Sequence, residues 1–126
     1  MEHLKTHVDD LGGGRAILHL GGEVDLATEA KLANELERLA QDGFEAVVID
    51  ATDISFMDST GFHAFVEGKR LLHERGSRII LVASPPMRQI LDLLAPEPIF
   101  AARVDSFDEA MALLDDVALR TVPEAS

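Results

Sequence analysis

The chain has 126 residues, contains no cysteine and carries a formal net charge of −12 at pH 7. This length accommodates one domain with a buried core, and the lack of cysteine excludes disulfides, thiol chemistry and cysteine-based zinc sites. Nucleic acid and anionic membranes require a basic surface, so we expect neither as a direct partner. The acidic charge either favours a partner with a basic docking face or only keeps the protein soluble. The sequence has no signal pattern and no apolar run of about 18 residues, which predicts a cytoplasmic protein.

The hydrophobic pattern predicts strands and helices that alternate after an opening hairpin. In chain order, we expect strands at 3–8, 16–20, 46–49, 78–83 and 99–101, and helices at 27–41, from 58 to near 76, from 85 and from 106. Gly12-Gly13-Gly14 is predicted as the hairpin turn, and Gly21 to Asp25 as the turn that follows the second strand. Gly43 suits the end of the first helix.

The starts of the last two helices carry capping signals. Ser84 is a predicted N-cap followed by a proline at the first helical position, and Ser106 to Glu109 form a capping box. The buried faces are predicted to be Met87, Ile90, Leu91 and Leu94 in the third helix, and Phe107, Ala110, Met111, Leu114 and Val117 in the last one.

This alternation predicts an α/β domain with a mixed, mostly parallel sheet of about five strands, an N-terminal antiparallel hairpin and about four helices. We expect the domain to span residues 1–120 and the tail at 121–126 to be frayed. In such sheets, the loops at the carboxyl ends of the strands form the functional edge. The segments Asp50 to Ser59 and Gly21 to Asp25 are both predicted to lie there.

The segment from Val47 to Gly61 is the most informative part of the sequence. An apolar run ends at Asp50, a short polar loop is predicted next, and a helix opens at Asp58-Ser59. Helix N-termini have unpaired N–H groups and favour negative charge, so Ser59 is either a structural cap or an acceptor of phosphate. Asp58 is able to cap the helix instead, and Gly61 would leave space for the backbone of a partner or for a nucleotide. The residues alone leave both interpretations open.

Catalysis by Ser59 has little support. A nucleophile elbow needs glycine two residues before the serine, where this chain has Met57. His63 is predicted to point away from the helix cap, so it does not suit the role of a base. We therefore expect no catalytic residue.

Metal and nucleotide sites are equally unsupported. His3 and His7 share a spacing of four but are expected to lack supporting carboxylates, and His19 and His73 are expected to be isolated. The glycine clusters match no phosphate-binding loop, and no P-loop lysine follows them. We expect neither a metal nor a cofactor.

Three segments in order resemble STAS domains, specifically the bacterial anti-sigma factor antagonists. The first runs from Leu20 to Thr28 and includes Gly21-Gly22-Glu23-Val24-Asp25. The second is Asp50-x-x-x-Ile54-Ser55-Phe56-Met57-Asp58-Ser59-Thr60-Gly61. The third runs from Ile80 to Leu91 and includes Ser84-Pro85.

The resemblance implies a switch controlled by phosphorylation. In this family, the unphosphorylated antagonist binds an anti-sigma factor that is itself an ATP-dependent serine kinase, which releases the sigma factor. The kinase then phosphorylates the serine that matches Ser59, and a serine phosphatase restores the binding form. The protein is a substrate and binding module without catalysis of its own. The resemblance implies a partner-binding surface made of Asp25, Met57, Asp58, Ser59, Thr60, Gly61, Phe62 and His63.

One part of the motif departs from the family. The hydroxyl residues are usually followed by Gly-Leu-Gly, whereas this chain has Gly61-Phe62-His63. Phe62 still supplies an apolar anchor, but the bulky His63 would change the choice of partner. An alternative is a STAS subunit that docks on a transporter or another complex without being phosphorylated.

Overall fold

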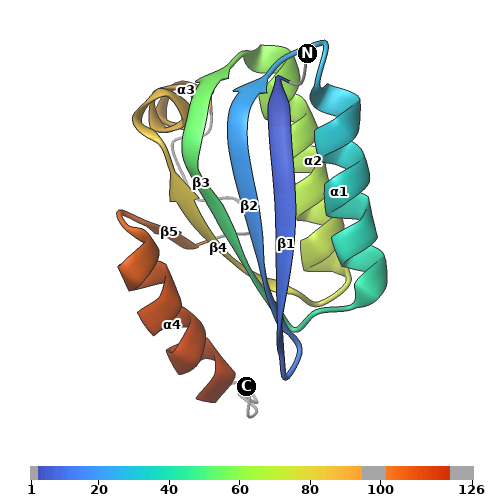
Figure 1. Ribbon diagram of the computed structural model, residues 1–126, viewed down its shortest axis with the longest axis vertical. Helices are drawn as coiled ribbons and strands as arrows, with labels where there is room; N and C mark the ends of the chain where they lie inside the picture. Colours follow the sequence, from blue (N-terminus) through green and yellow to red (C-terminus); the bar gives the residue numbers. More distant parts are fainter. Residues whose placement is uncertain (1–2, 95–101, 120–126) are drawn as a thin grey trace.

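The computed structural model describes residues 3–94 and 102–119. These residues form five strands and four helices in the order β1 (Leu4–Gly12), β2 (Arg15–Val24), α1 (Glu29–Asp42), β3 (Ala46–Met57), α2 (Ser59–Glu74), β4 (Arg78–Ala83), α3 (Pro85–Leu94), β5 (Ala102–Val104) and α4 (Phe107–Leu119). The strands lie in one sheet in chain order (Figure 1). β1 and β2 are antiparallel, and the other neighbours are parallel. The predicted α/β class with an N-terminal hairpin is confirmed.

The sheet is covered by helices on both faces. α1 and α2 lie on one face, and α4 lies on the other, where it packs mainly on β3, β4 and β5 (Figure 1). The larger core lies under α1, α2 and α3 and includes Leu18, Val47, Ile49 and Leu81. The smaller core lies under α4 and consists of Ile17, Ala46, Val48, Ile80, Val82, Ala110 and Leu114. Because neighbouring residues of β3 enter opposite cores, its first half is a continuous apolar run.

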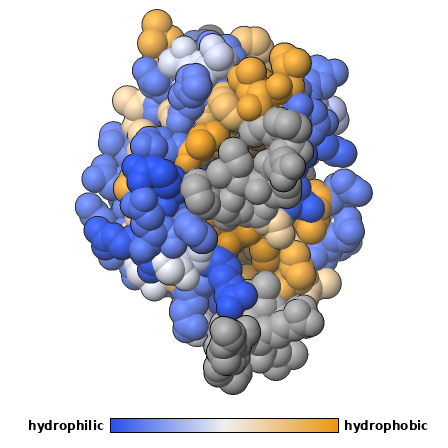
Figure 2. Space-filling model, turned by 180° about the vertical axis from the view of Figure 1, so that it is seen from behind, coloured by the Kyte–Doolittle hydropathy of each residue, from blue (hydrophilic) through white to orange (hydrophobic). Residues whose placement is uncertain are grey.

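β1 forms one edge of the sheet, and no described helix covers it on the α4 side. Its pairing with β2 is irregular between Asp10 and Gly12. Seen from behind, hydrophobic side chains gather in the upper right part of the surface, and hydrophilic ones dominate the left part (Figure 2). No helix in the described ranges has the length and apolar character needed to cross a bilayer.

Two strands are longer than predicted. β2 continues through Val24, where a turn from Gly21 to Asp25 was expected, and β3 continues through Met57, where a polar loop was expected. The two extensions pair with each other in parallel register, so their backbone hydrogen bonds offset the low strand propensity of glycine and aspartate. Gly22 has φ of +106°, and a Cβ there would stand 2.1 Å from the carbonyl oxygen of His3. A glycine is therefore required where β1 approaches.

Most helix boundaries agree with the sequence pattern. α1 ends at the left-handed Gly43 (φ 73°), and β4 coincides with the predicted strand at 78–83. The Ser84 hydroxyl accepts a hydrogen bond from the Met87 amide at 3.3 Å. The Ser106 hydroxyl accepts one from the Glu109 amide at 3.1 Å, so both predicted N-caps are confirmed. The return bond of the capping box differs, because the Glu109 carboxylate accepts from the Asp105 amide and not from that of Ser106.

The predicted buried face of α3 is partly wrong. Met87 and Leu91 are buried and Ile90 is half-buried, but Leu94 is 46% exposed because the last turn of α3 lies outside the described core. In α4, Ala110 and Leu114 are buried as expected, and Phe107 and Met111 are half-buried.

Three predictions concern parts of the chain that the structure does not describe. The strand expected at 99–101 and the frayed tail at 121–126 lie outside the described residues, and the strand that is described begins at Ala102. The side chain of Val117 also lies outside the described set.

Candidate functional site

Ser59 is the first residue of α2, directly after the N-cap Asp58. The Asp58 carboxylate accepts a hydrogen bond from the Gly61 amide at 2.9 Å. The Asp58 amide donates to the Val24 carbonyl oxygen at 3.2 Å, and the Phe62 amide donates to the Asp58 carbonyl oxygen at 2.8 Å. Asp58 is thus held by the end of β2 and by the first turn of α2, and its predicted capping role is confirmed.

The Ser59 side chain is exposed. Across the described ranges, its hydroxyl makes no hydrogen bond, because the Asp58 carboxylate occupies the capping position. The hydroxyl therefore lies at the N-terminal end of the helix, where the dipole and the free N–H groups favour an anion. No histidine in the described part of the chain is hydrogen-bonded to Ser59.

Gly61 has a different role from the one expected. A Cβ on Gly61 would stand 2.4 Å from the Val24 carbonyl oxygen and 2.6 Å from the Val24 Cγ1 atom. The space beside Gly61 is therefore filled by β2, and the expectation that it admits a partner or a nucleotide is wrong. Met57 and Phe62 are each 6% exposed. These three predicted partner-binding residues support the surface from below.

The remaining predicted partner-binding residues are accessible in different degrees. His63 is exposed, and its ring packs edge-on against Phe62 with centroids 5.6 Å apart. Asp25 and Thr60 are half-buried, as is Asp58. The Asp25 carboxylate accepts hydrogen bonds from the Ala27 amide at 3.0 Å and the Thr28 amide at 3.2 Å, so it also shapes the turn between β2 and α1.

Two exposed apolar side chains at this end of the sheet were missed as site residues. Leu26 is 73% exposed and follows Asp25 in the turn after β2. Phe56 is 47% exposed near the end of β3, and it pairs with Glu23 across the strands. Leu26 directly follows the motif acid Asp25, and Phe56 lies two residues before Asp58, so an apolar residue close to each acid was the available signal. Large exposed apolar side chains near one another are typical of protein-binding surfaces.

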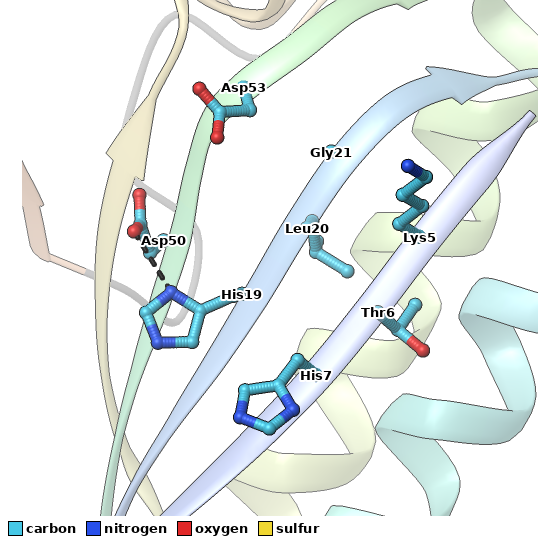
Figure 3. A pocket seen from close by; sticks show the side chains of 8 residues that line it. All are labelled: Lys5, Thr6, His7, His19, Leu20, Gly21, Asp50 and Asp53. Carbon is cyan, nitrogen blue, oxygen red and sulfur yellow. Dashed lines mark hydrogen bonds and ion pairs between the residues drawn. The ribbon is translucent and has the colours of Figure 1, made fainter.

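A second polar cluster lies on the face of the sheet that carries α4, where the His19 ring lies 6.2 Å from the ring of Phe107. His7, His19 and Asp50 are abreast on β1, β2 and β3. His19 Nδ1 lies 3.1 Å from an Asp50 oxygen (Figure 3). His19 Nε2 lies 3.0 Å from an oxygen of Asp9. His7 Nε2 contacts the other Asp9 oxygen at 2.8 Å. The hydrogen bonds from His7 and His19 lower the pKa of Asp9.

The expectations for these histidines were therefore wrong. His19 is not isolated, and His7 does have a carboxylate beside it, because strand register brings together residues far apart in the sequence. The cluster borders a hollow of about 200 Å³ that Asp53 and Lys5 also line (Figure 3). Within residues 3–94 and 102–119, no group of three or more such side chains is arranged to hold a metal ion.

Comparisons with known proteins agree with this architecture. The model of the family described as STAS domain matches residues 5–110. The anti-sigma-B factor antagonist of Staphylococcus aureus is 30% identical over 63 residues, which are 50% of this chain and 58% of that protein. The similarity thus spans little more than half the length of that relative.

Two solved structures show the same fold. An anti-sigma factor antagonist from Mycobacterium paratuberculosis has a TM-score of 0.74 and 23% identity, and the match covers 90% of this chain and 95% of that one. The Bacillus cell fate determinant SpoIIAA in its phosphorylated form has a TM-score of 0.65 and 20% identity, and the match covers 87% of this chain and 99% of that one.

Proposed function

Because this chain belongs to the STAS domain family, we propose that it is an anti-sigma factor antagonist whose partner binding is controlled by phosphorylation of Ser59. The observation that carries the proposal is that the cap of α2 is Asp58 and not Ser59. Asp58 caps the helix, and the Ser59 hydroxyl is exposed without a structural task. A kinase is able to reach such a hydroxyl without unfolding the helix.

The electrostatics of the site support a switch. A phosphate adds about −1.5 to −2 charge at pH 7, and a helix N-terminus tolerates this charge. The folded domain therefore keeps its structure after modification. A docked partner, however, would meet the phosphate together with the neighbouring carboxylates of Asp58 and Asp25. Like charges and unpaired charges at an interface weaken binding.

The apolar side chains beside the site support a docking surface. Leu26 and Phe56 present exposed apolar area at the same end of the sheet as Ser59. Buried apolar anchors commonly supply most of the affinity of an interface. A phosphate on Ser59 would bring a hydrated dianion into this surface, which opposes the burial of both side chains.

In the proposed cycle, the unphosphorylated protein binds an anti-sigma factor that is a serine kinase in its ATP-bound form, and the sigma factor is released. The kinase transfers the γ-phosphoryl group to Ser59. The bond from phosphorus to the ADP oxygen breaks, the bond to Ser59 Oγ forms, and the hydroxyl proton passes to a base of the kinase. A serine phosphatase later hydrolyses the phosphoester with water. The relative from Staphylococcus aureus is named an anti-sigma-B factor antagonist, which supports this role.

The test is phosphorylation by a purified anti-sigma factor kinase with ATP, followed by mass spectrometry of the intact protein and its peptides. We expect one phosphate on Ser59 and none on Ser59→Ala. Thr60→Val is the matched control, since it removes the adjacent hydroxyl and should leave phosphorylation unchanged. A phosphate on Thr60, or binding of the kinase that is the same for the unmodified protein and for Ser59→Asp, would contradict the proposal. The second result would instead favour a STAS subunit that docks without phosphorylation.

A further inference from the structure

A groove of about 500 Å³ lies between α1 and α2, on the helical side of the molecule. Its inner surface includes Ala30 and Ala33 of α1, and Ala64 and Leu71 of α2. The two alanines of α1 are exposed, and Ala64 and Leu71 are half-buried. The groove is therefore an open apolar furrow on the surface.

The groove follows from how the two helices pack. A Cβ on Gly68 would stand 2.2 Å from the Leu36 side chain, so this glycine allows a close contact between α1 and α2. Beside the contact, alanines leave the space between the helices unfilled. Ala30, Ala33 and Glu37 recur at helical spacing on one face of α1. The furrow therefore extends over about two turns, or roughly 11 Å.

The rim of the groove is acidic. Glu29 and Glu37 lie on the α1 side, and Glu67 lies on the α2 side. Arg70 of the same helix binds Glu67 at 2.8 Å and thereby lowers the pKa of that carboxyl group. Glu29 and Glu37 have no cationic partner in the described part of the chain. The α1 rim therefore presents uncompensated negative charge, in a chain whose net charge is −12.

The groove is continuous with the surface around Ser59. His63 lies one turn after Ser59 in α2 and lines the groove. Its ring packs against Phe62, which anchors the first turn of the helix in the core. A partner that covers Ser59 would thus reach the groove over His63 without a break in the surface.

We propose that this groove receives a basic, amphipathic helix of the partner that covers Ser59. The apolar residues of that helix would lie over Ala33 and Ala64, and its lysine or arginine side chains would pair with Glu29 and Glu37. Helices that bind in grooves present apolar anchors at such spacings, and complementary charge selects among them. The inference rests on the proposed function for the identity of the partner. It adds a second contact area and the chemistry that this area recognises.

The test measures the affinity of the purified kinase that phosphorylates Ser59, by calorimetric titration of this protein and its variants. Ala33→Arg would fill the furrow and place a cation there, and we expect it to weaken binding by about tenfold or more. Asn34→Arg is the matched control. Asn34 is exposed on the same helix but does not line the groove, so this substitution adds the same charge outside it. It should change the affinity by less than about threefold.

A second variant tests the charge of the helix. Glu29→Gln/Glu37→Gln should weaken binding at low salt and make the affinity less dependent on salt. If the wild type binds the kinase and is phosphorylated while Ala33→Arg and the double variant bind equally well, the groove inference is overturned and the proposed function stands. If no kinase binds or phosphorylates the wild type, both are overturned.

Discussion

Gly61 packs against the end of β2, so closely that a Cβ on it would stand 2.4 Å from the Val24 carbonyl oxygen. The same carbonyl accepts the hydrogen bond from the Asp58 amide. The position of Ser59 is thus set from the neighbouring strand, because Asp58, directly before it, and Gly61, two residues after it, both contact Val24.

Gly61→Ala should lower the free energy of unfolding by about 3 kcal/mol, since the added methyl group has backbone atoms as neighbours and the helix start must shift. Urea denaturation measures this loss. Gly43→Ala is the control, because a Cβ there meets nothing within 4 Å and only the positive φ is strained. That change should cost about 1 kcal/mol. Equal losses of unfolding free energy in the two variants would show that the close contact with Val24 does not add to the cost of Gly61→Ala.

Removing the cap should affect folding far more than removing the neighbouring hydroxyl. Asp58→Ala loses the hydrogen bond to the Gly61 amide and should lower stability by about 1 kcal/mol. Ser59→Ala removes an exposed group without a partner in the described structure and should stay within about 0.5 kcal/mol of the wild type. Thermal melting followed by circular dichroism distinguishes the two. A large loss for Ser59→Ala would mean that Ser59 has a structural role.

A permanent negative charge at Ser59 should imitate the phosphorylated form. Ser59→Asp is expected to keep its melting temperature, because the helix N-terminus accepts an anion. It should weaken binding of the anti-sigma factor kinase by roughly 3 kcal/mol if the charge enters the interface. Asn34→Asp adds the same charge at an exposed site of α1 and serves as the control. Similar affinities for the two variants would argue against Ser59 as the switch.

Lys69 should limit stability at neutral pH. Its side chain is 3% exposed, with the ammonium group 4.8 Å from the Phe65 ring centre, and burial together with the charge of Arg103 lowers its pKa to about 8. The unfolded chain holds this proton more tightly, so folding is disfavoured below pH 8 and this cost disappears as pH rises to about 10. Lys69→Met should therefore add about 2 to 3 kcal/mol at pH 7.

The measurement is urea denaturation at pH 7 and pH 10. The advantage of Lys69→Met over the wild type should shrink at the higher pH, whereas Lys5→Met, at an exposed position, should gain nothing at either pH. An advantage that does not change with pH would assign the gain to packing alone.

Asp9 should make the sheet sensitive to acid. The hydrogen bonds from His7 and His19 hold its pKa below the ordinary value of 3.8 in the folded state. The stability that Asp9 contributes is therefore complete at a pH above its ordinary pKa of 3.8. This stability is lost as the pH falls through the lower pKa of the folded state. Asp9→Asn should melt at a lower temperature than the wild type near neutral pH, and the difference should vanish in strong acid. Asp53→Asn, which lines the same hollow without an ion pair in the described structure, should show no such trend.

The parts of the fold that were predictable depend on local chemistry. Asp58, Ser84 and Ser106 cap their helices through hydrogen bonds within three residues, so a short stretch of sequence contains all the participants. The apolar runs of β3 and β4 are likewise continuous because both of their faces are covered.

The errors came from contacts between distant segments. Gly21 and Asp53 have low strand propensity by themselves, and only the parallel pairing between β2 and β3 makes them strand residues. His19 is hydrogen-bonded to the carboxylates of Asp9 and Asp50, which lie on two other strands. The groove between α1 and α2 depends on the close approach at Gly68, which no single segment specifies.

The outer edge of β1 has a consequence for the behaviour of the protein at high concentration. An unpaired strand edge can recruit a strand of another molecule and start aggregation. Here the edge strand carries Lys5, His7, Asp9 and Asp10, and the register of its pairing shifts between Asp10 and Gly12. A second copy that aligned its own β1 would have to desolvate these polar side chains and match an irregular backbone. The polar side chains and the irregular pairing of β1 therefore disfavour strand pairing between molecules at this edge of the sheet.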